Sequence, residues 1–248
     1  MASFIRVALF GSKNSKPSAF DPAKDITPLT DRVILITGGA GDLGRQTAIE
    51  LGRFGKPAHI YLADLPRDEA AQEVAIGAVR DTLPADVQAV VKVSFLDLDL
   101  GSLDAVQTAA ARFRELEGRL DVLVLNAGIM PVKAGLSKDG YEVTFGVNYL
   151  GHALFTRLLM PVLVETQTKQ ADVRVVVVAS EGHSMAPKGG IVFGALKTNC
   201  DKMVCSCFCV YRFPVEEVRR KLTVFPELLP PLWAEQGGAH RAHEAASI

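Results

Sequence analysis

Cysteine is nearly absent from this sequence, and long apolar runs are missing altogether. All four cysteines, Cys200, Cys205, Cys207 and Cys209, lie in one short stretch, so the first 199 residues hold none. The main fold therefore has no disulfide framework, and we expect a reducing, cytoplasmic setting. Because no apolar run reaches roughly 18 residues, no transmembrane segment is expected.

An excess of charge of one sign is also lacking. The 27 Lys and Arg residues are balanced by 28 Asp and Glu residues, and no long basic run occurs. Nucleic acid is therefore not an expected partner, because phosphate binding needs clustered positive charge. A metal site is not expected either. The spacing Cys205-x-Cys207-x-Cys209 differs from the paired Cys-x-x-Cys of zinc sites, and no matched pair of ligands follows it.

What the sequence does contain is an alternation of apolar strands and helices. The chain has 248 residues, 48% of them apolar, which suits one α/β domain. Ser102 is the expected N-cap of the third helix. The order predicts a Rossmann-type, doubly wound parallel sheet in a three-layer α/β/α domain. Strands are expected at 32–37, 59–64, 87–95, 120–125 and 173–178, and helices at 45–54, 67–80, 103–116 and 141–164.

The alternation covers only part of the chain. Residues 1–31 are polar and contain prolines, and we interpret them as an N-terminal extension. Residues 32–203 form the expected dinucleotide-binding Rossmann domain. Residues 204–248 show neither a clean strand nor a capped helix of any length, so we expect an aberrant, poorly ordered tail. A doubly wound sheet normally continues further, and its far-edge strands are expected to be missing.

A glycine-rich turn follows the first strand and precedes the first helix. A helix N-terminus offers unpaired N–H groups and a positive dipole end, and glycines let a pyrophosphate approach the backbone. Gly38 is expected to form the tight turn, and Gly44 to let the helix pack closely on the strand. The alternative is a turn needed only for geometry. The candidate dinucleotide-binding residues of this turn are Thr37, Gly38, Gly41, Asp42, Leu43 and Gly44.

Asp64 ends the second strand, 20 residues after Gly44. A carboxylate at this place accepts hydrogen bonds from the adenosine ribose hydroxyls and repels a 2′-phosphate, which favours NAD over NADP. Arg67 lies nearby in sequence and would soften that preference. The alternative is that Asp64 only caps the loop that follows it.

Four further segments make the pattern specific to one family. They are Leu98-Asp99-Leu100, Asn126-Ala127-Gly128, Val147-Asn148-x-x-Gly151-His152 and the fifth strand with Ser180 at its end. In this order and spacing, together with the glycine turn, they resemble the short-chain dehydrogenase/reductase family. Within it the chain is similar to the retinol-dehydrogenase-like branch that is abundant in fungi. The resemblance extends over about 20–203, and the stretch 180–191 is also typical of that branch.

The resemblance implies roles for individual residues. Asn148 would hold a water in a proton relay, and Ser180 would hydrogen-bond the substrate carbonyl or hydroxyl. Simpler alternatives exist for the polar ones: Asn126 could stabilise the central strands, Asn148 could be a polar interruption in a packed helix, and Ser180 could cap a strand end. Asp99 and Leu100 would lie by the adenine, and Asn126, Ala127 and Gly128 would line the floor under the cofactor.

The sequence departs from the family in two places. Asp42 stands where the most populous branch has glycine, and a carboxylate pointing inward there would repel a pyrophosphate. The Tyr-x-x-x-Lys pair, which supplies the proton in carbonyl reduction, is absent. The four tyrosines are Tyr61, Tyr141, Tyr149 and Tyr211, and the residues four positions later are Leu65, Phe145, Ala153 and Val215.

The tail suggests an origin for the missing pair. Shifting the codons of residues 231–237 forward by one nucleotide permits Arg-Tyr-Gly-Gln-Ser-Lys, the string this branch carries at its catalytic site. We therefore expect an NAD(P)-dependent oxidoreductase acting on a small alcohol or carbonyl, impaired in this chain. The alternatives are a non-catalytic dinucleotide-binding protein or a non-functional, mis-spliced product. The family also implies a homodimer as the typical assembly.

Overall fold

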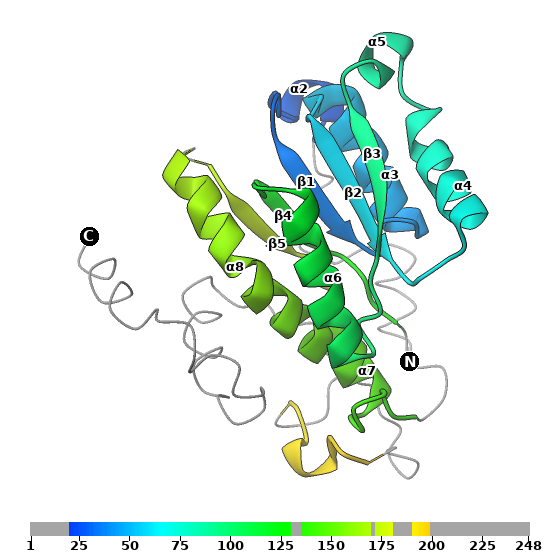
Figure 1. The fold of residues 1–248 in the computed structure, drawn as a ribbon, viewed down its shortest axis with the longest axis vertical. Helices are drawn as coiled ribbons and strands as arrows, with labels where there is room; N and C mark the ends of the chain where they lie inside the picture. The colour runs from blue at the N-terminus through cyan, green and yellow to red at the C-terminus, as the bar shows by residue number, and fades with distance from the viewer. Residues whose placement is uncertain (1–19, 130–134, 170–171, 181–189, 199–248) are drawn as a thin grey trace. The chain divides into compact units, whose positions relative to one another are not determined.

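The computed structural model describes residues 20–129, 135–169, 172–180 and 190–198. Its strands form one sheet in the order β3-β2-β1-β4-β5, and every neighbouring pair is parallel (Figure 1). This order reverses direction between β1 and β4, which is the doubly wound arrangement, so the predicted fold class is confirmed. The strands are β1 (Val33–Thr37), β2 (His59–Asp64), β3 (Lys92–Asp97), β4 (Val122–Leu125) and β5 (Arg174–Val177).

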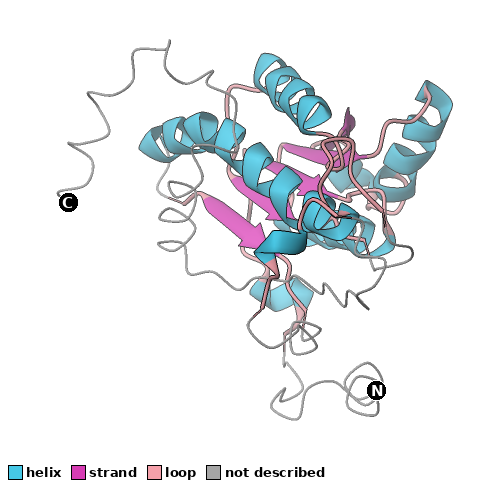
Figure 2. Cartoon of the chain, turned by 90° about the horizontal axis from the view of Figure 1, so that it is seen from below, coloured by secondary structure: helices cyan, strands magenta, loops and turns pink. Residues whose placement is uncertain are grey.

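Helices cover both faces of the sheet (Figures 1 and 2). The helices α3 and α4 contact each other and the β1–β3 half, while α6 and α8 pack together on the other side. The helical segments are α2 (Pro22–Asp25), α3 (Asp42–Glu50), α4 (Glu69–Arg80), α5 (Ala85–Gln88), α6 (Leu103–Leu116), α7 (Val143–Phe145) and α8 (His152–Lys169), the π-helical turns η1 (Leu51–Gly55) and η2 (Gly146–Gly151), and the 3-10 turn η4 (Phe193–Ala195).

The central strands are buried because both of their faces are covered. Every residue of β1 is buried, and in β2 only the last residue, Asp64, is partly exposed. Such strands need apolar side chains on both sides, which explains why they stand out in the sequence as continuous apolar runs. Their side chains form a core with α3, α4 and α5 that includes Ile34, Ile36, Ile49, Ile60, Leu62, Val79, Val87 and Val91.

The predicted start of the third strand is wrong. Residues 85–88 form the short helix α5 after Pro84, and β3 begins only at Lys92. Val87 and Val91 are both buried in the core beneath this turn. Their spacing of four residues suits one face of a helical turn, so packing overrides the strand preference of the valines.

The predicted long helix is present but is not uniform. It continues from α7 through the π-helical turn η2 into α8, with Pro161 inside α8. The stretch Val143–Lys169 is long and apolar enough to span a membrane by length and composition, and half of its most apolar window is buried inside the protein. Partial burial is what a core helix of this fold requires, because α8 covers the sheet next to α6.

The ends of the domain differ in how they pack. Before β1, Leu29 donates its N–H to Gly55 and packs on the core, so the predicted N-terminal extension contacts the domain from at least this residue onward. At the other side, β5 pairs with β4 and exposes Val176 and Val177 within the described part of the chain. The predicted tail, 204–248, and all four cysteines lie outside the described residues.

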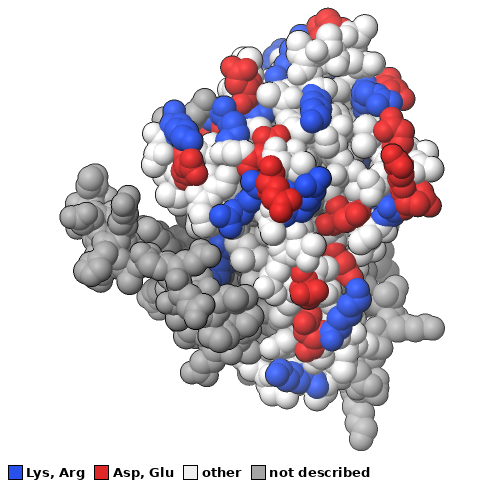
Figure 3. Space-filling view, in the orientation of Figure 1, with Lys and Arg blue, Asp and Glu red and all other residues white. Residues whose placement is uncertain are grey.

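On the face shown in Figure 3, basic and acidic side chains are interspersed rather than gathered by sign. Among the described residues, ion pairs join Arg80 with Glu73 and Lys169 with Glu165. The described part of the face in Figure 3 therefore shows no positive patch of the kind that binds nucleic acid. Among the described residues, no group of three or more His, Cys, Asp or Glu side chains is placed to hold a metal ion.

Candidate cofactor-binding site

The glycine turn connects the carboxyl end of β1 to α3. Gly38 has a φ of +65°, in the left-handed region that glycine tolerates best. Its N–H donates to Ala63 at 2.7 Å, which ties the turn to β2, and the Gly41 N–H donates back to Gly38 at 3.1 Å. Gly41 is the N-cap of α3, and no side chain of the described residues caps this helix end. The first N–H groups of α3 are therefore available to an anion.

Gly44 lies in the first turn of α3, directly against Gly38. A Cβ at this position would collide with the Gly38 carbonyl oxygen and would come within 2.9 Å of Asn126 Nδ2. Only a glycine lets α3 approach the turn this closely. The close approach brings the helix N-terminus, the tight turn and the end of β4 together at one edge of the sheet.

Two side chains of the turn face outward. The Asp42 side chain is 99% exposed and forms an ion pair with Arg45 at 2.9 Å. Leu43 is 63% exposed. The carboxylate of Asp42 therefore lies in solvent and is paired with a cation, which lessens the repulsion that its position in the sequence suggests.

Asp64 ends β2 beside the turn, and both of its carboxylate oxygens are engaged. Oδ2 accepts from the Ala40 N–H at 3.0 Å, inside the glycine turn. Oδ1 accepts from the Leu65 N–H at 2.9 Å and lies 3.3 Å from Arg67. Asp64 thus caps its own loop, as the simpler alternative holds, and also fixes the turn. An ionised carboxylate has about four acceptor positions, so it can still accept from a ribose hydroxyl.

Arg67 is held in place beside Asp64 from two sides. Its guanidinium lies 5.7 Å from the centre of the Phe95 ring on β3. Its carbonyl oxygen accepts from the Gln72 side chain at 3.0 Å, and that amide also donates to Asp97. A cation stacked on an aromatic ring is a suitable partner for the adenosine end of a dinucleotide.

Asp99 and Leu100 are not oriented alike. Asp99 accepts from the Gly101 N–H at 2.9 Å and pairs with Lys138 at 2.8 Å. Leu100 is 5% exposed, and a Cβ on Gly151 would collide with its carbonyl oxygen. Leu100 therefore packs against the long helix. The predicted adenine contacts of these two residues stay predictions.

Thr37 joins the ends of β1 and β4. Its hydroxyl oxygen accepts from the N–H of Asn126 at 2.9 Å and from that of Ala127 at 3.0 Å. The Asn126 side chain returns a bond to the Thr37 carbonyl at 2.9 Å. We call the bonds of the Thr37 hydroxyl to these two amides the Thr37 clamp. The bonds between Asn126 and Thr37 join the ends of β1 and β4, which supports the alternative that Asn126 stabilises the central strands.

Asn148 fixes the same segment from the other side. Its Oδ1 accepts from the Ile129 N–H at 2.8 Å, and its Nδ2 donates to the Ile129 carbonyl at 3.0 Å. A Cβ on Gly128 would lie 3.5 Å from the Asn148 side chain. We call the two bonds with Ile129 the Asn148 clamp. Asn148 lies in the π-helical turn η2, a type of irregularity frequent at functional sites.

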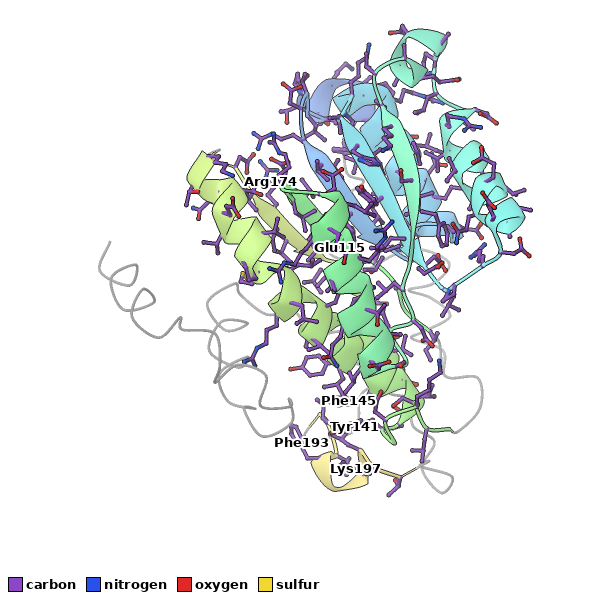
Figure 4. All side chains as sticks on the ribbon, in the orientation of Figure 1. Glu115, Tyr141, Phe145, Arg174, Phe193 and Lys197 are labelled. Carbon is purple, nitrogen blue, oxygen red and sulfur yellow. The ribbon has the colours of Figure 1, made fainter. Side chains whose placement is uncertain are left out.

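Ser180 follows β5 by three residues and is exposed. Because all five strands are parallel, it lies at the same sheet edge as the ends of β1, β2 and β4. The segment 190–198 lies near the start of the long helix, where the Glu142 N–H donates to Leu196 at 2.7 Å. Figure 4 shows Tyr141, Phe145, Phe193 and Lys197 near one another there, with Lys197 Nζ 5.2 Å from the Tyr141 ring centre.

Sequence reasoning missed two contributors to this edge. The Ala40 N–H and the Phe95 ring carry no motif signal of their own, since a backbone amide and a core aromatic look alike in any sequence. His152 belongs to a motif that the sequence already singled out, four residues after Asn148 on the helix, but it was given no role in the site. A cavity of about 290 Å³ lined by Glu117, Arg119 and Thr166 lies elsewhere, at the amino end of β4.

Comparison with known proteins identifies the family. The sequence model described as short chain dehydrogenase matches residues 32–208. An uncharacterized oxidoreductase, C736.13, of Schizosaccharomyces pombe is 42% identical over 171 residues, or 68% of this chain and 48% of the relative. The short-chain dehydrogenase/reductase prx1 of Penicillium rubens is 35% identical over 71% of this chain and 49% of its own. Human polyprenol dehydrogenase is 37% identical over 64% of this chain and 46% of its own length.

Solved structures agree on the fold. A crystal structure of an uncharacterized protein from Mycobacterium paratuberculosis aligns with a TM-score of 0.58 and 31% identity, over 82% of this chain and 66% of that one. The NADH-dependent reductase A1-R′ complexed with NAD aligns with a TM-score of 0.53 and 23% identity, over 69% of this chain and 67% of that one. The chain spans about half the length of the curated relatives it matches. It belongs to the short-chain dehydrogenase family.

Proposed function

We propose that the protein is an NAD(P)-dependent oxidoreductase acting on a small alcohol or carbonyl compound, and that this chain supplies its dinucleotide-binding half. The observation that carries the proposal is the uncapped N-terminus of α3, held against Gly38 by Gly44 at the point where the sheet order reverses. Dinucleotides bind at such switch points in doubly wound sheets. Family membership favours an oxidoreductase over a non-catalytic binding protein.

The residues at this edge fit a nicotinamide dinucleotide. The pyrophosphate would lie at the turn, by Gly38, Gly41, Leu43 and Gly44, and Thr37 and Asn126 would hold the floor. Asp64 and Arg67 would take the adenosine ribose, with Asp64 favouring NAD over NADP. Asp99 and Leu100 would lie toward the adenine. When bound, the cofactor supplies or accepts a hydride.

Ser180 and Asn148 supply only part of the catalytic chemistry. Ser180 would hydrogen-bond the reacting oxygen, and Asn148 would hold a water in the proton relay. In the family the proton comes from the tyrosine of the Tyr-x-x-x-Lys pair, whose pKa is lowered by the adjacent lysine. A serine hydroxyl and an asparagine amide are much weaker acids than such a tyrosine, so neither Ser180 nor Asn148 can replace it. We therefore propose that this chain binds the cofactor and that its turnover of substrate is severely impaired. The frame-shifted string in residues 231–237 supports a splicing or reading-frame origin for the loss.

The proposal extends to the assembly, the location and the domain division of the protein. A homodimer is the assembly typical of the family. A cytoplasmic location is consistent with the absence of cysteine from residues 1–199. Residues 32–203 are the proposed Rossmann domain, flanked by an N-terminal extension and by the aberrant tail 204–248.

The experiment compares two proteins. The mature transcript is sequenced across codons 200–240, and any spliced form that restores Tyr-Gly-Gln-Ser-Lys is expressed beside the 248-residue chain. Both are assayed with NAD(H) and NADP(H) against a panel of primary alcohols, secondary alcohols, aldehydes and ketones. We expect turnover in the restored protein and none above background in the 248-residue chain. Turnover by the latter would refute the proposed impairment, and inactivity of a folded restored protein would refute the oxidoreductase.

A further inference from the structure

A buried histidine joins the two clamps of the cofactor floor. His152, the first residue of α8, is 7% exposed, and its two ring nitrogens contact polar atoms on different elements. Nε2 lies 2.8 Å from the Thr37 hydroxyl oxygen at the end of β1. Nδ1 lies 3.1 Å from the main-chain oxygen of Asn148 in η2. The imidazole therefore bridges the Thr37 clamp and the Asn148 clamp.

The partners fix where the protons lie. A carbonyl oxygen can only accept, so the bond to Asn148 requires a proton on Nδ1. In the neutral ring Nε2 is then an acceptor, and it takes the single hydroxyl proton of Thr37. The Thr37 oxygen keeps its two lone pairs, which the Asn126 and Ala127 N–H groups occupy. Every polar atom in this chain of bonds has a partner.

The other tautomer would break this arrangement. A proton on Nε2 would point at the Thr37 hydroxyl and would leave Nδ1 facing the Asn148 carbonyl with no proton between them. Thr37 would then have to direct its own proton to the Val124 carbonyl, 3.5 Å away. That distance is at the limit of a hydrogen bond, whereas the Nε2 contact is short. Geometry therefore selects the Nδ1–H form.

The bridge acts on one short segment. Asn126 and Ala127 are held by Thr37, and Ile129 is held by Asn148, so the backbone 126–129 is fixed from both ends. His152 is not in the segment but contacts both of its anchors. Losing the bridge would leave the buried Thr37 hydroxyl proton with only the Val124 carbonyl, 3.5 Å away, as its acceptor and would remove the side-chain donor to the Asn148 carbonyl.

We propose that His152 is a positioning residue for the cofactor floor, which as the Nδ1–H tautomer sets the backbone 126–129 by joining Thr37 to Asn148. The inference rests on the proposed function, because it assumes that this segment lies under the dinucleotide. A histidine that only fills space in the core would be replaceable by a leucine without effect on the segment or on the ligand.

Three substitutions separate the two contacts. His152→Asn keeps a donor at the Nδ1 position for the Asn148 carbonyl but does not reach Thr37. His152→Gln keeps an acceptor near the Nε2 position for Thr37 but has no donor for Asn148. His152→Leu removes both. Thr156→Val is the matched control, since the Thr156 hydroxyl is buried in α8 and has no hydrogen-bond partner within the part of the chain that the structure describes.

Two measurements are made on each protein. Long-range proton–nitrogen NMR near neutral pH reports the tautomer of His152 and the backbone amide shifts of Asn126, Ala127 and Ile129. Calorimetric titration with NAD gives the dissociation constant. We expect the Nδ1–H tautomer in the unmodified protein. His152→Asn should shift the amide signals of Asn126 and Ala127 most, and His152→Gln should shift that of Ile129 most. His152→Leu should weaken NAD binding about tenfold.

The outcomes are distinguishable. An Nε2–H tautomer, or a His152→Leu protein with unchanged amide shifts and unchanged NAD affinity, overturns the proposal. If His152→Leu does not fold, the opposite patterns of amide shifts expected for His152→Asn and His152→Gln still decide it. If the unmodified protein is folded but binds no NAD, the proposed function fails, while the tautomer and the amide shifts still decide whether His152 positions the segment. Thr156→Val should match the unmodified protein in both measurements.

Discussion

Gly44 packs so closely on the carbonyl oxygen of Gly38 that no Cβ fits between them. We therefore expect Gly44→Ala to force α3 away from the turn and to destabilise the protein by about 3 kcal/mol, as overpacking of a tight site does. The thermal midpoint should fall by roughly 10 °C. Gly118→Ala is the matched control, because a Cβ there meets nothing within 4 Å. Equal melting temperatures for Gly44→Ala and Gly118→Ala would contradict the close packing of Gly44 on Gly38.

The pair Asp64 and Arg67 should set cofactor preference in opposite directions. Replacing Asp64 with Asn removes the negative charge that repels a 2′-phosphate, so affinity for NADP should rise relative to NAD by about tenfold. Replacing Arg67 with Ala removes the nearby cation and should shift the ratio the other way. Titration of each variant with both dinucleotides gives the ratio. A ratio that stays constant in both variants would show that this pair does not read the ribose.

Asp121 is a buried carboxylate at the amino end of β4, and it should be essential for stability. It accepts from Arg32 at 2.9 Å, from the Val33 N–H at 2.8 Å and from Arg119 at 2.7 Å. Asp121→Asn leaves the arginines partly unpaired and should cost about 3 kcal/mol. Asp42→Asn breaks an ion pair whose carboxylate is 99% exposed and should leave the melting temperature unchanged. Chemical denaturation of both variants measures the difference.

The same carboxylate has a predictable pH dependence. Burial alone would raise the pKa of Asp121, but hydrogen bonds from Arg119, Val33 and Arg32 outweigh burial and leave the pKa lowered. A lowered folded-state pKa means that the stabilisation is present above the unfolded pKa and is lost as the pH falls through the folded value. The stability difference between the unmodified protein and Asp121→Asn should therefore shrink only in strong acid.

His152 should make stability depend on pH in a milder range. Burial lowers its pKa from 6.5 to about 4. Between these values the unfolded chain binds a proton that the folded protein does not, so stability should fall as the pH drops from 6.5 towards 4. The contribution is up to about 3 kcal/mol. Urea denaturation across this range should show a shallower dependence in His152→Asn, and identical slopes would mean that His152 is not buried as a neutral ring.

Much of the fold could be predicted from sequence because its strongest signals are local. The strand β2 matches its predicted bounds, since a continuous apolar run with a polar end leaves little choice. The helix α6 also matches, because Ser102 caps it by accepting from the Ala105 N–H. The predicted start of β3 was wrong because Val87 has strand propensity. In the structure Val87 lies in the helical turn α5, where it packs in the core with Val79 of α4 and Leu62 of β2.

The site was harder to predict in one specific respect. The sequence indicates which residues gather at the sheet edge, but not which of their atoms are already occupied. Asp64 uses both oxygens inside the protein, and Asn148 uses both ends of its side chain on Ile129. The contacts of Asp64 with Ala40 and of Asn148 with Ile129 join residues 24 and 19 positions apart, so no local pattern reveals them. His152 belongs to the same class of residue.

Calorimetric titration of this chain with NAD, with NADP as the comparison, tests the central claim most directly. The sample must first show a cooperative melting transition, so that a negative result describes the folded protein. We predict saturable binding of NAD at one site per chain, with weaker binding of NADP and a rise in melting temperature as NAD is added. A folded sample that gives neither heat nor stabilisation with millimolar NAD would contradict dinucleotide binding by this chain.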